Sequence, residues 1–178
     1  QSEVLWESFI DVQYHFGNSV TNINMAPASP AQLVTGQDIN ITFDCATEEE
    51  KGAHVFARPY TNGSLTPGYG ASGGFFFTGT DSGTQWFHID TDNQRIDQIR
   101  VYMRTADLSE VIWETFVDVD YHICDTGSCV WYVDTDAVGT GTGHTWANAF
   151  NDLQDALAVA WPGEQIWVAE GTYTPDQG

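Results

Sequence analysis

Val111-Ile-Trp-Glu-Thr-Phe-Val-Asp-Val-Asp-Tyr-His-Ile123 is the stretch that decides the fold of this chain. Apolar and polar side chains alternate strictly along it. One face carries Val111, Trp113, Thr115, Val117, Val119, Tyr121 and Ile123. The opposite face carries Glu114, Asp118, Asp120 and His122. A period of two over this length predicts a long antiparallel strand with one buried face.

The same motif occurs earlier, as Val4-Leu-Trp-Glu-Ser-Phe-Ile-Asp-Val-Gln-Tyr-His-Phe16, and the two copies are identical at 8 of 13 positions. The repeat predicts a recurring domain whose last strand is residues 111–123. Only three residues precede the first copy, so its apolar face is an exposed edge unless something covers it. The side chains expected to associate with a partner are Val4, Trp6, Ile10, Val12 and Tyr14.

The first copy has three possible roles. It could complete a preceding repeat, insert into a neighbouring subunit by strand addition, or pair within its own chain. We expect donation to a neighbour, covalent or not, in preference to pairing within the chain.

The composition limits the classes of partner. A chain of 178 residues with 42% hydrophobic and 13% aromatic residues can bury a core in one large or two small domains. Only 5 Lys and Arg stand against 25 Asp and Glu, and this net charge of -20 repels nucleic acid and anionic membranes. No stretch approaches the roughly 18 apolar residues of a membrane span. Gln1-Ser-Glu does not begin a signal peptide, so we expect any export signal to lie upstream or to have been removed.

Residues 20–123 show no helical period. Alternating or apolar strands are expected at 20–25, 39–45, 55–58, 75–77, 85–89 and 96–103, with a long loop at 59–74 and a turn at 78–84. Short strands separated by turns are typical of an immunoglobulin-like antiparallel β-sandwich. The segment Ser29-Pro-Ala-Gln-Leu…Gly36-Gln-Asp-Ile-Asn-Ile-Thr-Phe43 resembles the opening strands of Ig-like repeats in large bacterial surface proteins.

The pattern changes after Cys129. Trp131-Tyr-Val-Asp is followed by the glycine-rich loop 138–144, an amphipathic helix expected over 146–160, and a strand with a turn at 166–175. This order resembles the start of a right-handed parallel β-helix of the pectin-lyase-like family, in which the helix caps the first coil. The resemblance places any catalytic residue on later coils. One coil cannot bury its own face, so we expect the natural chain to continue past Gly178.

These patterns predict a mainly β chain with four parts. Residues 1–19 are the final strand of a preceding repeat or a donated strand, and residues 20–123 form the Ig-like sandwich. Residues 124–130 are a linker, and residues 131–178 are the β-helix cap with its first coil.

The three cysteines have different expected roles. Cys124 and Cys129 bracket a short turn-forming loop and could close it as a disulfide in an oxidising compartment. Cys45 continues the inward row of residues 39–43 and should pack as a small buried hydrophobe. A zinc site is not predicted, because no Cys or His pair accompanies the cysteines at ligand spacing.

Oxygen-bearing side chains suggest a cation site. Asp90, Asp92, Asn93 and Asp97 lie within eight residues, and calcium favours such clusters. The alternative is a solvated acidic turn. Asp134 and Asp136 form a second candidate with fewer ligands.

No catalytic residue or organic cofactor is predicted. His122 shares a strand face with Glu114 and Asp118, which could serve general acid–base chemistry, but its recurrence as His15 favours a cross-strand pair instead. Exposed aromatic residues could stack on sugars, although core packing is their default role. The candidates are Tyr60, Tyr69, Phe75 and Trp86.

We therefore expect a non-enzymatic, extracellular or cell-surface structural module of an adhesin, stalk or filament. Its expected partners are neighbouring copies of the same protein or repeat and, in addition, a polysaccharide. The alternative is the accessory region of a polysaccharide lyase or hydrolase whose catalytic coils lie downstream.

Overall fold

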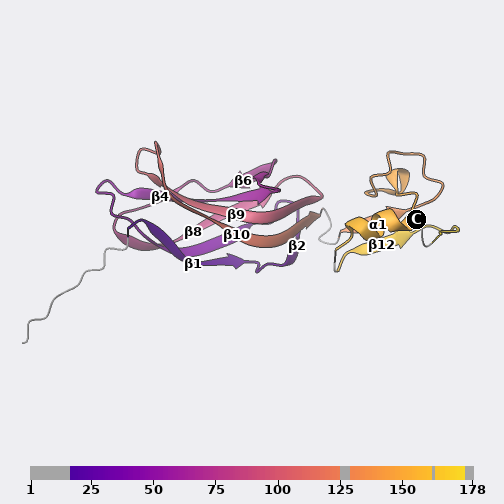
Figure 1. Cartoon of the computed structure of the whole chain (residues 1–178), viewed down its shortest axis with the longest axis horizontal. Helices are drawn as coiled ribbons and strands as arrows, with labels where there is room; N and C mark the ends of the chain where they lie inside the picture. The colour runs from indigo at the N-terminus through magenta and orange to yellow at the C-terminus, as the bar shows by residue number, and fades with distance from the viewer. Residues whose placement is uncertain (1–16, 125–128, 162, 175–178) are drawn as a thin grey trace, which may run out of the picture.

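The computed structural model describes residues 17–124, 129–161 and 163–174. Figure 1 shows that strands β1 to β10 form one elongated body and that β11, α1 and β12 form a second, smaller body. We call these the two-sheet unit and the C-terminal unit. The predicted associating strand, with Val4, Trp6, Ile10, Val12 and Tyr14, lies outside the described residues.

The two-sheet unit is built from ten strands. Their bounds are β1 Ser19–Ala26, β2 Ala31–Val34, β3 Ile39–Ala46, β4 Ala53–Thr61, β5 Ser64–Leu65, β6 Tyr69–Ala71, β7 Phe75–Phe77, β8 Thr80–Ile89, β9 Gln94–Thr105 and β10 Val111–Cys124. One sheet has the order β1-β3-β8-β6, and the other has the order β2-β10-β9-β4-β5 with β7 beside β4.

The core lies between the two sheets because the inward rows of both alternate with polar residues. The first sheet contributes Ile39, Ile41, Phe43, Cys45, Phe87 and Ile89. The second contributes Ala53, Val55, Ala57, Ile99, Val101, Met103, Val119, Tyr121 and Ile123. Cys45 is buried as predicted, and burial raises the pKa of its thiol to about 11.

Strand β10 is the strand predicted from the repeated motif. It pairs antiparallel with β9 on one side and parallel with β2 on the other. The fully buried Tyr121 donates its phenol O–H to the carbonyl oxygen of Pro27 at 2.7 Å, and burial raises the pKa of Tyr121 to about 12. The connector at residues 26–30 is thereby attached to β10, and β2 continues from it along the edge of the sheet.

Two sequence-based predictions in this unit are wrong. The expected loop at 59–74 contains β5 and β6, and the expected turn at 78–84 is mostly the first half of β8. Thr80 pairs with Ala46 and Thr84 with Thr42, so this half of β8 lies along residues 42–46 of β3. Tertiary pairing therefore overrides the low strand propensity of its Asp, Ser and Gly residues.

The C-terminal unit contains β11 Val130–Val133, a 3₁₀ turn Trp146–Asn148, α1 Leu153–Val159 and β12 Gln165–Val168. β11 and β12 are parallel. The predicted helix over 146–160 is wrong in extent, because Phe150 leaves the helical path to exchange main-chain hydrogen bonds with Tyr132 and Asp134. Asp152 caps the shorter helix, in which Leu157 is 53% exposed.

The described chain is therefore mainly β, with antiparallel and mixed sheets, as the sequence predicts at this level. None of its described helices is long and apolar enough to cross a bilayer.

Candidate functional site

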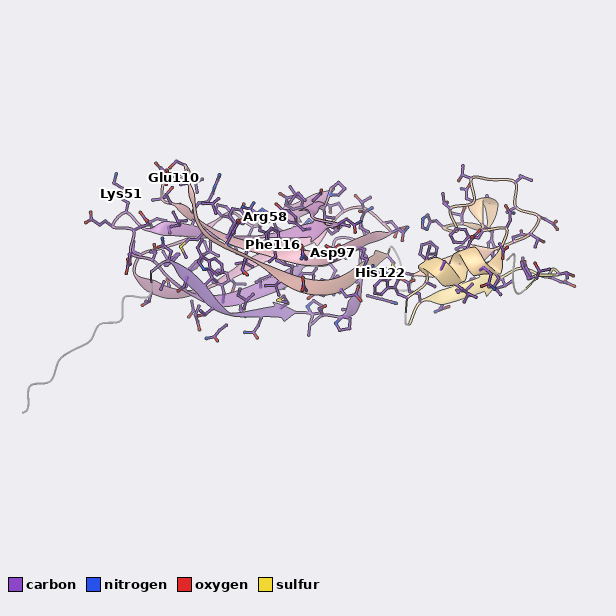
Figure 2. All side chains as sticks on the ribbon, in the orientation of Figure 1. Lys51, Arg58, Asp97, Glu110, Phe116 and His122 are labelled. Carbon is purple, nitrogen blue, oxygen red and sulfur yellow. A yellow bond between two sulfur atoms is a disulfide. The ribbon has the colours of Figure 1, made fainter. Side chains whose placement is uncertain are left out.

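The two units meet at the end of β10, where His122 contacts Glu164. Figure 2 labels His122 at the end of the two-sheet unit that faces the C-terminal unit. Its Nδ1 atom lies against Oε1 of Glu164, which precedes β12. The Glu164 side chain is 0% exposed and that of His122 is 13% exposed. A carboxylate from one unit is thus buried against a histidine from the other.

The second oxygen of Glu164 is held within its own unit. Oε2 accepts hydrogen bonds from the indole Nε1–H of Trp131 at 2.7 Å and from the main-chain N–H of Trp161 at 2.9 Å. A buried carboxylate is costly unless such partners surround it. Glu164 therefore connects three points of the junction, one on β10, one on β11 and one after α1.

Trp161 also contacts the two-sheet unit through Arg95. The guanidinium carbon of Arg95 lies 3.4 Å from the Trp161 ring centroid, within the range of a cation–π contact. Arg95 Nε is 3.4 Å from Asp120 Oδ1. A hollow of about 490 Å³ lies beside these groups and is lined on the two-sheet side by Pro30, Ala31, Gln32 and Asp120.

The structure joins Cys124 and Cys129 in a disulfide with a Cα–Cα distance of 5.4 Å. The bond spans the connection from β10 to β11. The Cys129 Sγ atom is 3.9 Å from His122 Nδ1. One ligand-type atom each from His122, Cys129 and Glu164 falls within 4.8 Å of the others.

The candidate calcium residues lie in and after the turn between β8 and β9. Asp92 Oδ1 accepts from the Asn93 N–H at 2.8 Å, and Asn93 Nδ2 lies 2.7 Å from His144 Nε2. Asp97, within β9, accepts from the Asn62 N–H at 2.7 Å. Asp90 Oδ1 is 3.5 Å from His88 Nε2. Across the described ranges, no three of these acidic side chains converge on one point, and calcium binding here stays a prediction.

The second cation candidate is a loop after β11. Asp134 Oδ1 accepts from the Asp136 N–H at 3.0 Å, and its carbonyl oxygen accepts from Asn151 Nδ2 at 3.0 Å. These bonds shape the turn.

His122 does not act with the carboxylates of its own strand. Glu114 accepts from Arg100 Nε at 2.9 Å, and Asp118 accepts from Gln98 Nε2 at 2.9 Å. Acid–base chemistry of His122 with these two groups has no contact to support it, and His122 contacts Glu164 instead. Across the strands, His122 lies opposite Arg95 on β9 and Gln32 on β2. Glu164, Arg95 and Trp161 carried no sequence signal, because the fold alone brings them to β10.

The aromatic candidates divide between core and surface. Phe75 and Tyr69 pack against the core, as the default role predicts. Trp86 is 36% exposed, and the Tyr60 ring meets that of Phe116 edge-on, with a centroid separation of 5.3 Å.

Neither a scan against protein-family models nor a search of the curated proteins finds a match for this chain. The Ig-like and β-helix resemblances therefore rest on the motifs in the sequence.

Proposed function

We propose that this chain is a non-enzymatic structural module of an extracellular or cell-surface protein. In this proposal the two-sheet unit is an Ig-like sandwich, the C-terminal unit is the cap of a β-helix, and the whole is a segment of an adhesin, stalk or filament. The observation that carries the proposal is the junction at Glu164. A spacer has to hold its parts in line, and a buried carboxylate bonded to both units does this.

Association through strands is the second element of the proposal. The outer surface of the C-terminal unit exposes Trp167 and Val168 of β12, at 48% and 43%, together with Trp146 and Leu157. A further strand laid against β12 would pair with its main-chain edge and cover part of the exposed side chains of β12, as one coil stacks on the next in a β-helix. Such a strand would come from a neighbouring copy or a neighbouring repeat.

The donated-strand hypothesis predicts the outcome of deleting residues 1–16. The described strands β1 to β10 make both sheets from residues 19–124, so we expect the shortened chain to stay folded. Higher oligomers of the full chain should be lost. Sedimentation velocity measures the mass, and circular dichroism measures the fold. A matched control is Trp6→Asp with Ile10→Asp, which keeps the length but charges the apolar row. Unfolding of the two-sheet unit, or an unchanged mass distribution, would contradict strand donation.

A second function, as a polysaccharide-binding accessory region, is favoured by the outer face of the larger sheet. Across β4, β9 and β10 the register aligns Phe56 with Tyr102, and Arg58 with Arg100 and Phe116. Figure 2 labels Arg58 and Phe116 on this unit. The Phe56 and Tyr102 rings stack with centroids 5.2 Å apart, and Arg100 lies 4.4 Å from the Tyr102 centroid. We call these five residues the aromatic face.

Arg58 is the cation of the aromatic face that favours an acidic sugar, because Arg100 is already paired with Glu114 at 2.6 Å. Arg58 and Arg100 are two of the five cationic side chains in a chain of net charge -20. Arg58 donates to the carbonyl oxygens of Ala57 and Ser72, and no ion pair is found for it within the described residues. Aromatic rings can stack on sugar rings while an uncompensated guanidinium binds a carboxylate. A uronic-acid polymer carries both features.

Affinity electrophoresis in gels with a polyuronate or a neutral glucan tests this function. We expect the polyuronate to retard the chain, and Arg58→Ala or Phe116→Ala to weaken binding roughly 10-fold, the effect of losing about 1.4 kcal/mol. Trp86→Ala is the matched control, because Trp86 is an exposed aromatic residue on the other sheet. Equal retardation by both polymers, or an equal loss in the control, would exclude an acidic ligand on this face.

A further inference from the structure

The atoms gathered at the junction form a set of metal ligands that crosses the two units. His122 Nδ1, Cys129 Sγ and a Glu164 carboxylate oxygen all lie within 4.8 Å of one another, the only group of this kind in residues 17–124, 129–161 and 163–174. Ligand atoms around a tetrahedral zinc ion are about 3.5 Å apart, given zinc–ligand bonds of roughly 2.0–2.3 Å. The 3.9 Å between Cys129 Sγ and His122 Nδ1 is close to that spacing.

Cys124 supplies the fourth ligand. It is joined to Cys129, so on reduction its sulfur starts beside that of Cys129, outside the 4.8 Å group, and has to turn toward the shared ion. Four residues separate the two cysteines, a spacing typical of structural zinc sites. We propose that His122, Cys124, Cys129 and Glu164 bind one zinc ion when the Cys124–Cys129 disulfide is reduced.

Glu164 is held as a zinc-ligating carboxylate should be. Two N–H donors, from Trp131 and Trp161, fix Oε2 and leave Oε1 turned toward His122. Outer hydrogen bonds of this kind orient metal ligands and are a regular part of metal sites. When zinc binds, Glu164 Oε1 and His122 Nδ1 no longer contact each other directly. Each of the two atoms bonds to the zinc ion instead. His122 then carries its proton on Nε2.

The burial fits a closed structural site. The side chain of Glu164 is 0% exposed, that of His122 is 13% exposed, and Cys124 and Cys129 are both buried. Two thiolates and an imidazole favour zinc over calcium, which prefers oxygen ligands. The sequence did not predict this site because Glu164 is 35 residues beyond Cys129 and reaches it only through the fold.

The disulfide and the zinc site exclude each other. A dithiol or phosphine reductant gives two electrons to the disulfide, and two protons taken up from water complete the two thiols. Zinc then binds both sulfurs as thiolates, and the two thiol protons are released. In either form the connection from β10 to β11 is cross-linked. The zinc form additionally ties Glu164 to it, so the junction stays closed under both oxidising and reducing conditions.

The experiment uses the full chain, with cobalt(II) as the spectroscopic probe and zinc in competition against a chromophoric chelator. After reduction with a phosphine, we expect one equivalent of cobalt, with the visible bands of tetrahedral coordination and a thiolate charge-transfer band. One equivalent of zinc should displace it. The oxidised chain, lighter by two hydrogens in intact-mass analysis, should give neither band. A reduced chain without the tetrahedral spectrum, or an oxidised chain that binds equally well, would overturn the proposal.

Variants identify the ligands. Cys129→Ser, His122→Ala and Glu164→Gln should each remove the tetrahedral spectrum. Trp131→Phe removes one of the two donors to Glu164 Oε2 and keeps an aromatic ring in the core of the C-terminal unit, and it should weaken zinc binding by about 10–100-fold. Cys45→Ser is the matched control, because Cys45 is a free cysteine in the core of the two-sheet unit and should leave binding unchanged. If Glu164→Gln unfolds the C-terminal unit, His122→Ala on β10 decides the case. Unchanged affinity in that variant would contradict the site.

Discussion

Replacing Glu164 with glutamine in the oxidised chain is expected to open the C-terminal unit while the two-sheet unit stays intact. Glutamine has the same shape, but its amide NH₂ must face either His122 or the two N–H donors from Trp131 and Trp161. Removing one partner of a buried ionic or hydrogen-bonded group costs about 3–5 kcal/mol. A sheet of only two strands, β11 and β12, is marginal by itself and cannot absorb such a loss.

Amide hydrogen exchange measures this effect separately in each unit. Exchange in residues 130–133 and 165–168 should accelerate by roughly 100-fold or more, because each factor of ten corresponds to about 1.4 kcal/mol. Exchange in β3 and β9 should not change. Glu170→Gln is the matched control, since Glu170 is an exposed carboxylate of the same unit. If both variants exchange alike, Glu164 does not hold the junction.

Phe87→Ala is expected to have the largest effect within the two-sheet unit. Phe87 lies on β8 with 0% exposure, at the centre of the core shared by the two sheets. Truncating a buried phenylalanine costs about 3–5 kcal/mol through lost burial and the cavity left behind. This is a large part of the 5–15 kcal/mol by which a typical domain is stable.

The neighbouring residue provides the control. Trp86 precedes Phe87 on β8, and its side chain points to the opposite face with 36% exposed. Trp86→Ala should cost about 1 kcal/mol or less. Urea unfolding followed by far-ultraviolet circular dichroism gives both values from the shift in midpoint at constant slope. Similar shifts for the two variants would show that β8 is not buried on one face only.

The strands with strict alternation were predictable from sequence, and those defined by their partners were not. Ile39 to Cys45 and Val111 to Ile123 carry their own apolar rows, and both are strands. The predicted inward row of β3 is buried along its whole length. In the apolar row of β10, the side chains are buried only from Val119 to Ile123, and Val111 at the start of the strand is exposed. β2 and β6 are short and have no alternation to recognise, because pairing with β10 and β8 defines them.

The candidate site at the junction was also only partly predictable from sequence. The sequence pointed to His122, Cys124 and Cys129 because they lie in or beside a motif. Nothing local marks Glu164, whose neighbours Pro162 and Gly163 suggest only the end of a helix. Its role depends on α1 returning the chain beside β11, so that Gln165 donates its N–H to the carbonyl oxygen of Cys129 at 3.0 Å. Long-range contacts of this kind have no signature in a single sequence.

The parallel pairing of β2 with β10 also has a consequence for how the chain folds. Tyr121 bonds to Pro27 across 94 positions of sequence, so the edge at β2 cannot form until nearly the whole two-sheet unit is available. Closing so long a loop carries an entropic cost and slows folding in proteins rich in distant contacts. The hairpin β9–β10 joins consecutive strands and can assemble before it. His122 lies on the segment of β10 that pairs with β2. The C-terminal unit therefore packs against the part of the two-sheet unit that folds last. During synthesis or export, the two units are therefore expected to become ordered in the direction of the chain.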